Sequence, residues 1–162
     1  MLAQLTRAAP DARVLLAHAG LELGIHRGRV VVHAPPVGPF AVTWNGEAAL
    51  ALPHGMLEWV PVVGAGIAAG ALAESPVVVR RRTGGERIQL AANRPRQALK
   101  GLLQNARMPA WERASLPLVF CGDTLAAAPG IGTDLRFQAG QDVPGYLIRW
   151  HPRGTDGAGG DD

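Results

Sequence analysis

Residues 77–138 read VVVRRRTGGERIQLAANRPRQALKGLLQNARMPAWERASLPLVFCGDTLAAAPGIGTDLRFQ, and this stretch decides the fold that the sequence predicts. Its opening run of three valines predicts a strand that continues into the three arginines at residues 80–82. The glycines at 84 and 85 supply a turn, after which residues 87–90 predict a returning strand. Residues 97–107 are the best helix candidate in the chain, because one face carries the apolar side chains of Leu99, Leu102, Leu103 and Ala106.

Short strands are expected on both sides of that helix. Downstream, apolar runs predict strands at residues 116–120, 124–128, 131–137 and 146–150. Upstream, alternating apolar residues on either side of Arg27-Gly28-Arg29 predict a hairpin over residues 21–32. The dipeptide Asn45-Gly46 predicts a second hairpin, between residues 40–44 and 48–52. The remaining upstream expectations are a helix end at 2–9, a strand at 57–63 and a loop of small residues at 64–70.

Together these elements predict an α+β fold with two small domains, both dominated by short antiparallel strands. The C-terminal domain is expected to have a single prominent helix. We place the boundary near Glu74-Ser75-Pro76, where the charge balance changes, so the expected domains are residues 1–75 and 76–150. Residues 151–162, rich in Gly and Asp, are expected to form a disordered tail.

Composition restricts the class of protein. The chain has 162 residues, of which 48% are apolar, which suffices for one ordinary domain or two small ones. No run of eighteen apolar residues is present, so no membrane span is expected, and the N-terminus lacks the features of a signal peptide. The single cysteine, Cys121, excludes an internal disulfide and fits a cytoplasmic location.

The positive charge is concentrated in one segment. The net charge of the whole chain is only +3, but residues 76–113 hold nine basic and two acidic side chains. The nine are the candidate binding residues: Arg80, Arg81, Arg82, Arg87, Arg94, Arg96, Lys100, Arg107 and Arg113. Such a segment is typical of proteins with a polyanionic partner. A solvated face whose arginines serve only solubility is the alternative, and charge alone does not decide between them.

No catalytic centre or metal site is expected. Gly64-Ala65-Gly66 lacks both the third glycine of a dinucleotide loop and the lysine of a phosphate loop. Cys121 precedes a Gly-Asp turn without an activating partner nearby, which favours a small buried side chain over a nucleophile. The five histidines are scattered singly, without the spacing of zinc ligands.

The basic segment has the chemistry of a phosphate-binding surface. Its arginine-rich strand end and the turn at Thr83 to Gly85 place guanidinium groups beside exposed backbone N–H groups, a favourable arrangement for phosphate oxygens. Arg94 and Arg96 add charge just before a helix N-terminus, which also favours an anion. Trp111 is suited to stack on a base, but its apolar neighbours favour packing in the core.

The same stretch resembles the C-terminal domain of the bacterial tRNA(Ile)-lysidine synthase family. That family's pattern of R-x-R-x-G-G-E-R, a K-L-K-K-L-x-Q-E helix, G-V-P-P-W-x-R, P-L-L and G-D-x-L-V-A corresponds here, in order and spacing, to residues 80–87, 99–104, 108–113, 116–118 and 122–127. The chain departs from it at Gly101, Arg107 and Ala110, where a lysine, a glycine and a proline are usual. The stretch upstream, from His18 to Leu23 and the hairpin, resembles the family's link between catalytic core and terminal domain.

The resemblance implies that catalysis and tRNA binding belong to different domains. The family uses ATP to activate the wobble cytidine of an isoleucine tRNA, which lysine then attacks to give lysidine. That chemistry belongs to an N-terminal domain with an S-G-G-x-D-S loop, which this sequence does not contain. The chain is therefore expected to be a C-terminal portion that grips tRNA(Ile), with no cofactor of its own and with the N-terminal catalytic domain of the parent protein as its partner. A homodimer is a further expectation.

Two other classes of function remain open from the sequence. A non-catalytic packing or oligomerisation module would carry the same arginines only as solvated side chains. A free-standing RNA chaperone would bind RNA without an attached ATP-binding domain. Salt-dependent RNA binding separates the first alternative from the binding hypothesis, and the coding sequence ahead of Met1 separates the second.

Overall fold

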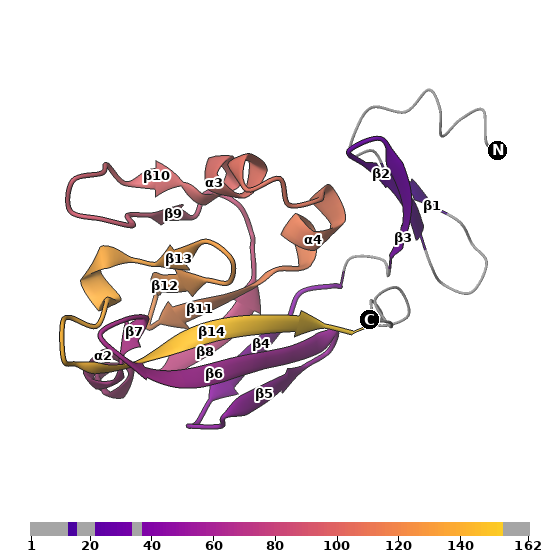
Figure 1. Ribbon diagram of the computed structural model, residues 1–162. Helices are drawn as coiled ribbons and strands as arrows, with labels where there is room; N and C mark the ends of the chain where they lie inside the picture. Colours follow the sequence, from indigo (N-terminus) through magenta and orange to yellow (C-terminus); the bar gives the residue numbers. More distant parts are fainter. Residues whose placement is uncertain (1–12, 16–21, 34–36, 154–162) are drawn as a thin grey trace.

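The computed structural model describes residues 13–15, 22–33 and 37–153, and Figure 1 shows their arrangement. The first three strands form a small antiparallel sheet in the order β1-β2-β3, with β1 at Arg13–Leu15, β2 at Glu22–His26 and β3 at Arg29–His33. The β2–β3 pair is the hairpin that the sequence predicts around Arg27-Gly28, and Gly28 has the positive φ of 77° that such a turn favours.

A five-stranded antiparallel sheet has the order β13-β12-β11-β8-β4. Its strands are β4 (Ala41–Trp44), β8 (Val77–Arg81), β11 (Pro117–Cys121), β12 (Thr124–Ala128) and β13 (Gly132–Thr133). Every residue of β11 is buried, because this strand is covered on both faces of the sheet. Such a strand is a continuous apolar run rather than an alternating one.

A four-stranded sheet, also antiparallel, lies against one face of the five-stranded sheet (Figure 1). Its order is β5-β6-β14-β7, with β5 at Ala49–Leu52, β6 at Gly55–Val63, β7 at Ile67–Ala68 and β14 at Pro144–Pro152. The core between the two sheets contains Leu57, Trp59, Ile67, Val79 and Val119, all at most 2% exposed. The short helix α2 (Ala69–Glu74) adds Leu72 to this core.

The opposite face of the five-stranded sheet is covered by a layer made from the basic segment. This layer contains the ribbon β9 (Arg87–Ile88) and β10 (Gln97–Ala98), followed by the helices α3 (Leu99–Asn105) and α4 (Ala110–Ser115). Its core is formed by Ile88, Leu99 and Leu103 against Leu118 and Phe120 of β11. A 3-10 turn, η2 (Leu135–Phe137), follows β13. The apolar face predicted for residues 97–107 is confirmed for Leu99, Leu102 and Leu103 but not for Ala106, which is exposed. The α-helix spans only 99–105, and a second short helix follows it.

The α+β class with mostly antiparallel strands is confirmed, but the sheets do not separate at residue 75. Strand β4, from the first expected domain, pairs with β8 from the second. Strand β14, near the end of the second, pairs with β6 over nine residues. The expected boundary is a short connection between α2 and β8 within a shared core, because apolar residues from both sides of it are needed to fill that core.

Three local expectations need correction. Asn45-Gly46 does not join a hairpin, because β4 pairs with β8 while β5 pairs with β6 in the other sheet. The turn at 83–85 likewise leads from β8 to β9, which pairs with β10. Residues 64–70 hold β7 and the start of α2 in addition to a loop, and only 132–133 of the strand expected at 131–137 form a strand.

Two expectations concern the ends of the chain. The helix end at residues 2–9 lies outside the described residues, as does most of the tail expected at 151–162. The described part of that tail still contains the end of β14, which runs to Pro152. Among the described residues no helix has the length and apolar character needed to cross a membrane.

Candidate nucleic-acid interface

Strand β8 presents its arginines to opposite faces of the five-stranded sheet. Side chains alternate along a strand, so Arg80 and Arg81 point in opposite directions. The Arg80 guanidinium lies over the Phe120 ring, 3.8 Å from its centroid, on the side covered by the basic layer. The Arg81 Nη1 donates to the Val37 carbonyl at 2.5 Å. The run of three arginines is therefore not one patch, and Arg81 joins the opposite face of the sheet.

The turn after β8 is closed by a carboxylate of the chain itself. Glu86 accepts hydrogen bonds from the Thr83 N–H at 2.7 Å, the Thr83 hydroxyl at 3.1 Å and the Gly84 N–H at 3.1 Å. Burial disfavours the ionised form of Glu86, but these hydrogen bonds outweigh it and lower its pKa. The backbone N–H groups of Thr83 and Gly84, two of those that the sequence suggested for phosphate, are thus occupied by Glu86, which fixes the turn instead.

The Asp134 carboxylate accepts hydrogen bonds from two arginines, Arg96 and Arg136. This carboxylate is fully buried. Its Oδ2 accepts from the Arg96 Nη1 at 2.9 Å and from the Gln89 N–H at 3.1 Å, while its Oδ1 accepts from the Arg136 N–H and Nε at 3.0 Å each. Burial raises the pKa of Asp134, but the hydrogen bonds from Arg136, Gln89 and Arg96 outweigh it and lower the pKa to about 2.

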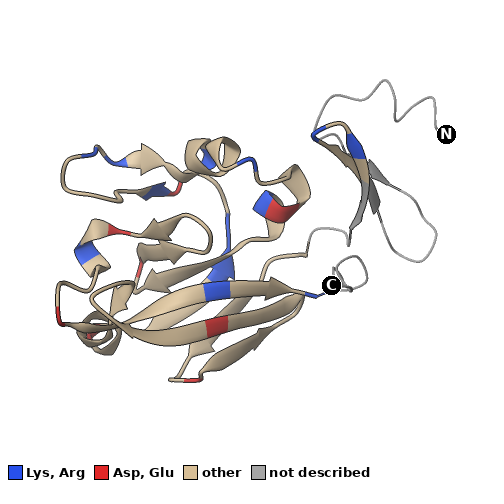
Figure 2. Ribbon diagram, viewed as in Figure 1, with Lys and Arg blue, Asp and Glu red and all other residues tan. Residues whose placement is uncertain are grey.

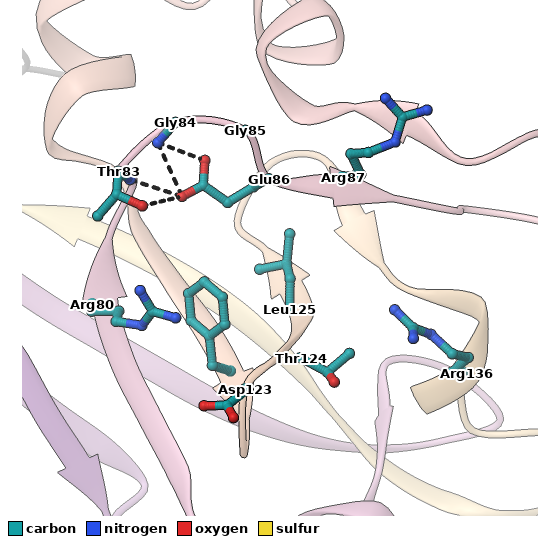
Figure 3. Close-up of a pocket in the computed structure, with 11 residues that line it drawn as sticks. Arg80, Thr83, Gly84, Gly85, Glu86, Arg87, Asp123, Thr124, Leu125 and Arg136 are labelled. Carbon is teal, nitrogen blue, oxygen red and sulfur yellow. Dashed lines mark hydrogen bonds between the residues drawn. The ribbon is translucent and has the colours of Figure 1, made fainter.

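A surface pocket of about 360 Å³ joins these features. Its cationic lining residues are Arg80, Arg87 and Arg136, which come from β8, β9 and η2 (Figure 3). The turn at 83–86 forms one wall and the start of β12 another. Arg87 donates from Nη2 to the Arg96 carbonyl at 2.9 Å, which links the pocket to the second arginine of the Asp134 cluster.

The other predicted residues do not line this pocket and come from several parts of the basic segment. Arg94 and Lys100 are exposed, on the β9–β10 connection and on α3. Arg107 is exposed with a φ of 59°, so it adopts the left-handed conformation for which glycine is usual at a helix end. Arg113 on α4 donates from Nη1 to the Met108 carbonyl at 2.6 Å. Arg82 is half-buried, and its buried Nε has no hydrogen-bond acceptor among the described residues.

Most of this charge is not neutralised within the described part of the chain. Of the nine predicted residues, only Arg96 forms an ion pair with a described carboxylate, that of Asp134. Figure 2 shows the basic residues of this segment on the end of β8, the β9–β10 ribbon, α3 and α4. The arrangement leaves a set of guanidinium donors free to bind an external anion.

Sequence reasoning missed Arg136, which lines the pocket although it lies outside the basic segment. The one local signal was the Asp134-Leu135-Arg136 spacing, in which the aspartate caps η2 by accepting from the Arg136 N–H. Trp111, by contrast, is only 7% exposed and its ring lies 6.2 Å from that of His26. It belongs to a packed contact with the β2–β3 hairpin and is not a platform for base stacking.

Three other features that the sequence raised as possible sites do not form one in the part of the chain that the structure describes. Cys121 is buried between the two large sheets, and burial raises the pKa of its thiol, which disfavours the reactive thiolate. No three His, Cys, Asp or Glu side chains among the described residues come together as metal ligands. Gly66 approaches the Tyr146 carbonyl closely, so its loop serves packing.

Comparisons with known proteins match this chain to one family. Residues 77–150 match the model of the TilS substrate C-terminal domain. The tRNA(Ile)-lysidine synthase of Nitrosomonas europaea is 36% identical over 160 residues, which cover 94% of this chain and 34% of that protein. That of Ralstonia nicotianae is 34% identical over 170 residues, covering 96% and 36%. The chain thus spans about a third of the length of these relatives.

The fold agrees with that assignment. A crystal structure of a TILS C-terminal domain superimposes with a TM-score of 0.57 at 23% identity, covering 72% of this chain and 98% of the other. A likeness at that identity shows a shared fold. The family model and the two relatives add a match in sequence. Residues 77–150 therefore match the TilS substrate C-terminal domain family in sequence and fold, and nearly the whole chain is similar to the corresponding third of tRNA(Ile)-lysidine synthases.

Proposed function

We propose that this chain is the tRNA-binding C-terminal portion of a tRNA(Ile)-lysidine synthase. Its role is to hold tRNA(Ile) so that an N-terminal domain, absent from this sequence, makes lysidine at the wobble cytidine from ATP and lysine. One observation carries the proposal: most arginines of the basic layer have no carboxylate partner among the described residues and so keep donors for an external anion. Phosphate contacts of this kind position a large nucleic acid without reading its sequence.

Salt-dependent binding tests the proposal directly. A filter-binding titration of the chain with a tRNA(Ile) transcript is expected to give an affinity that falls steeply as salt rises. Each neutralised phosphate contributes a slope of about −0.9 in log affinity against log salt for a duplex. Absence of binding at low salt, or an affinity that does not change with salt, would overturn the proposal.

A triple substitution locates the binding surface. Arg80→Gln, Arg82→Gln and Arg87→Gln together are expected to weaken binding at least tenfold, because three phosphate contacts are lost at once. The matched control replaces three exposed arginines that do not line the pocket, Arg29 on β3, Arg149 on β14 and Arg153 just after it, also by Gln. Equal effects of the two sets would mean that only overall charge matters and that the surface is wrongly located.

The chain alone is expected to lack the chemistry of the parent enzyme. Nothing in the described residues forms a nucleotide loop or a nucleophile with an activating base. An assay of ATP–pyrophosphate exchange with tRNA(Ile) and lysine should therefore show no activity. Adenylation of the tRNA by the purified chain would contradict this part of the proposal.

One observation favours the packing or oligomerisation module instead. The outward surface of the four-stranded sheet exposes apolar side chains, with Met56 40% and Leu147 38% exposed. Apolar side chains left exposed on a sheet are a usual feature of association surfaces. Sedimentation velocity over a concentration series distinguishes the two functions: self-association without any RNA binding would favour the module.

A further inference from the structure

The pocket described above is elongated, with an arginine at each end. Figure 3 shows Arg80 at one end and Arg136 at the other, with Thr124 and Leu125 between them. Because Thr124 and Leu125 lie between the two guanidinium groups, a chain of phosphates is better suited than one compact anion to contact both. A polyanion with regularly spaced charges can contact both.

Arg80 is held in place without losing its hydrogen-bond donors. Its guanidinium stacks on Phe120 at 3.8 Å, and this ring is only 4% exposed. Stacking orients the flat group and occupies its face, while the five N–H donors lie at its edge. No described residue accepts a hydrogen bond from Arg80, so that edge remains available at the pocket.

Arg136 is held by a different device. Asp134 Oδ1 accepts from both the backbone N–H and the Nε of Arg136, so the inner edge of the guanidinium is fixed. The Arg136 side chain remains 52% exposed while Asp134 is 0% exposed. The Nη donors of Arg136 therefore stay available at the pocket, oriented by a carboxylate that solvent does not reach.

Glu86 and Asp123 line the pocket and Asp134 lies beneath it, and the three carboxylates differ in their effect on a bound anion. Glu86 is occupied by Thr83 and Gly84, and Asp134 lies beneath the surface. Asp123, at the turn between β11 and β12, is exposed, and no hydrogen bond ties its carboxylate to a described residue. The charge of Asp123 repels an anion in the pocket, whereas the charge of Asp134 is balanced by its hydrogen bonds with Arg96 and Arg136.

We propose that this pocket is a groove for the phosphate backbone of RNA, in which Arg80 and Arg136 contact different phosphates and Asp134 positions Arg136. The inference rests on the proposed function and adds to it a defined site, a binding residue outside the basic segment and a positioning residue. Because the two arginines contact separate phosphates, their contributions to binding are independent of each other.

Single and double substitutions test the independence of the two arginines. Arg80→Gln and Arg136→Gln are each expected to lower tRNA affinity about tenfold at low salt, through the loss of charge-assisted hydrogen bonds. Each should also reduce the salt slope by about 0.7 to 0.9. The double variant should lose the product of the two factors, about a hundredfold. Arg149→Gln, outside the pocket, is the control.

Neutralising Asp123 and neutralising Asp134 are expected to change RNA affinity in opposite directions. Asp123→Asn removes a repulsive charge and is expected to strengthen RNA binding. Asp134→Asn removes the same charge but releases Arg136, and is expected to weaken binding about fivefold to tenfold. In the background of Arg136→Gln, Asp134→Asn should have little further effect, a readout that a general loss of structure would not give. The Arg80 and Arg136 variants still test the groove if Asp134→Asn does not fold.

The outcomes separate the groove from the proposed function. If the unaltered chain binds no RNA, the proposed function fails and the groove fails with it. If the chain binds RNA with a steep salt dependence but Arg80→Gln and Arg136→Gln behave as Arg149→Gln, only the groove is overturned. RNA with a 5′-hydroxyl and RNA with a 5′-phosphate should bind equally. A preference for the 5′-phosphate that Arg136→Gln abolishes would identify a terminal-phosphate site and overturn the backbone assignment.

Discussion

At the scale of single residues, Asp134 connects η2 to the β9–β10 region, which is far from it in sequence. It accepts from Gln89, 45 residues earlier, from Arg96, 38 residues earlier, and from Arg136, two residues later. A buried carboxylate without partners would cost several kcal/mol, so its hydrogen bonds are a condition for its burial. The same residue thus fixes β9, the β9–β10 ribbon and η2 relative to one another.

The depressed pKa of Asp134 predicts a loss of stability in acid. The pKa is about 2 in the folded chain against 3.8 as the ordinary value, so the ionised carboxylate stabilises the fold above about pH 4. As pH falls from about 4 to about 2, protonation removes about 2 kcal/mol of the free energy of unfolding. Urea unfolding at several pH values measures this. Asp134→Asn should be less stable at pH 7 and should lose less on acidification; an unchanged pH dependence would contradict the assignment.

Two glycines a few residues apart are expected to respond in opposite directions to alanine. Gly66 has a φ of 74°, and a Cβ there would lie 2.1 Å from the Tyr146 carbonyl oxygen. Gly66→Ala must shift β7 or β14 and should lower the free energy of unfolding by about 3 kcal/mol. Gly70, inside α2, has open space around it, so Gly70→Ala should raise that free energy by up to about 1 kcal/mol. Chemical denaturation compares them; equal effects would show that Gly66 is not constrained.

At the scale of elements, the contact between the β2–β3 hairpin and α4 depends on a missing side chain. A Cβ on Gly24 of β2 would lie 2.2 Å from the ring of Trp111, so the hairpin approaches α4 closely only because this residue is glycine. The ring of His26 completes the contact at 6.2 Å. Among the described residues, this contact joins the hairpin to α4.

Substitutions at this contact should release the hairpin while the main sheets stay folded. Gly24→Ala is expected to raise amide hydrogen exchange in β2 and β3 without a comparable change in β8 or β11, which lie in the cores. Trp111→Ala also removes buried apolar area and should cost about 3 kcal/mol or more in the free energy of unfolding. Hydrogen exchange followed by mass spectrometry resolves the segments. Unchanged exchange in β2 and β3 would mean that Trp111 does not hold them.

At the scale of the whole molecule, the two large sheets interlock across residue 75. Six of the twelve buried residues in the core between them precede that position: Leu50, Leu52, Leu57, Trp59, Ile67 and Leu72. Without β5, β6 and β7, only β14 would remain of the four-stranded sheet. Neither half can bury its apolar surface alone, so the described main body should unfold as one cooperative unit.

Truncation tests this dependence. Residues 76–162 alone are expected to be largely unfolded, whereas residues 37–162 should fold and unfold in a single transition. Circular dichroism and urea denaturation of both fragments measure the difference. A stable, cooperatively unfolding fragment 76–162 would restore the domain boundary that the charge pattern suggested.

The sequence by itself determined the properties that depend on neighbouring residues. Alternation and turn residues located most strands, the apolar face located α3, and the charge run located the basic layer. The motif from Arg80 to Ala127 indicated the family, because residue types and their spacing are properties of the linear sequence. These features depend only on residues close together in the sequence, so they can be predicted without the tertiary structure.

Only the tertiary structure decided which elements meet. Strand pairing is set by which apolar faces fill a shared core, so Asn45-Gly46 joins two sheets instead of one hairpin. Pleating directs Arg81 away from Arg80, and Glu86 occupies the backbone donors of its own turn. The Asp134 cluster brings Arg136 to the pocket through contacts across 38 and 45 residues. Such contacts form only when burial of the whole chain compensates the entropy of closing long loops.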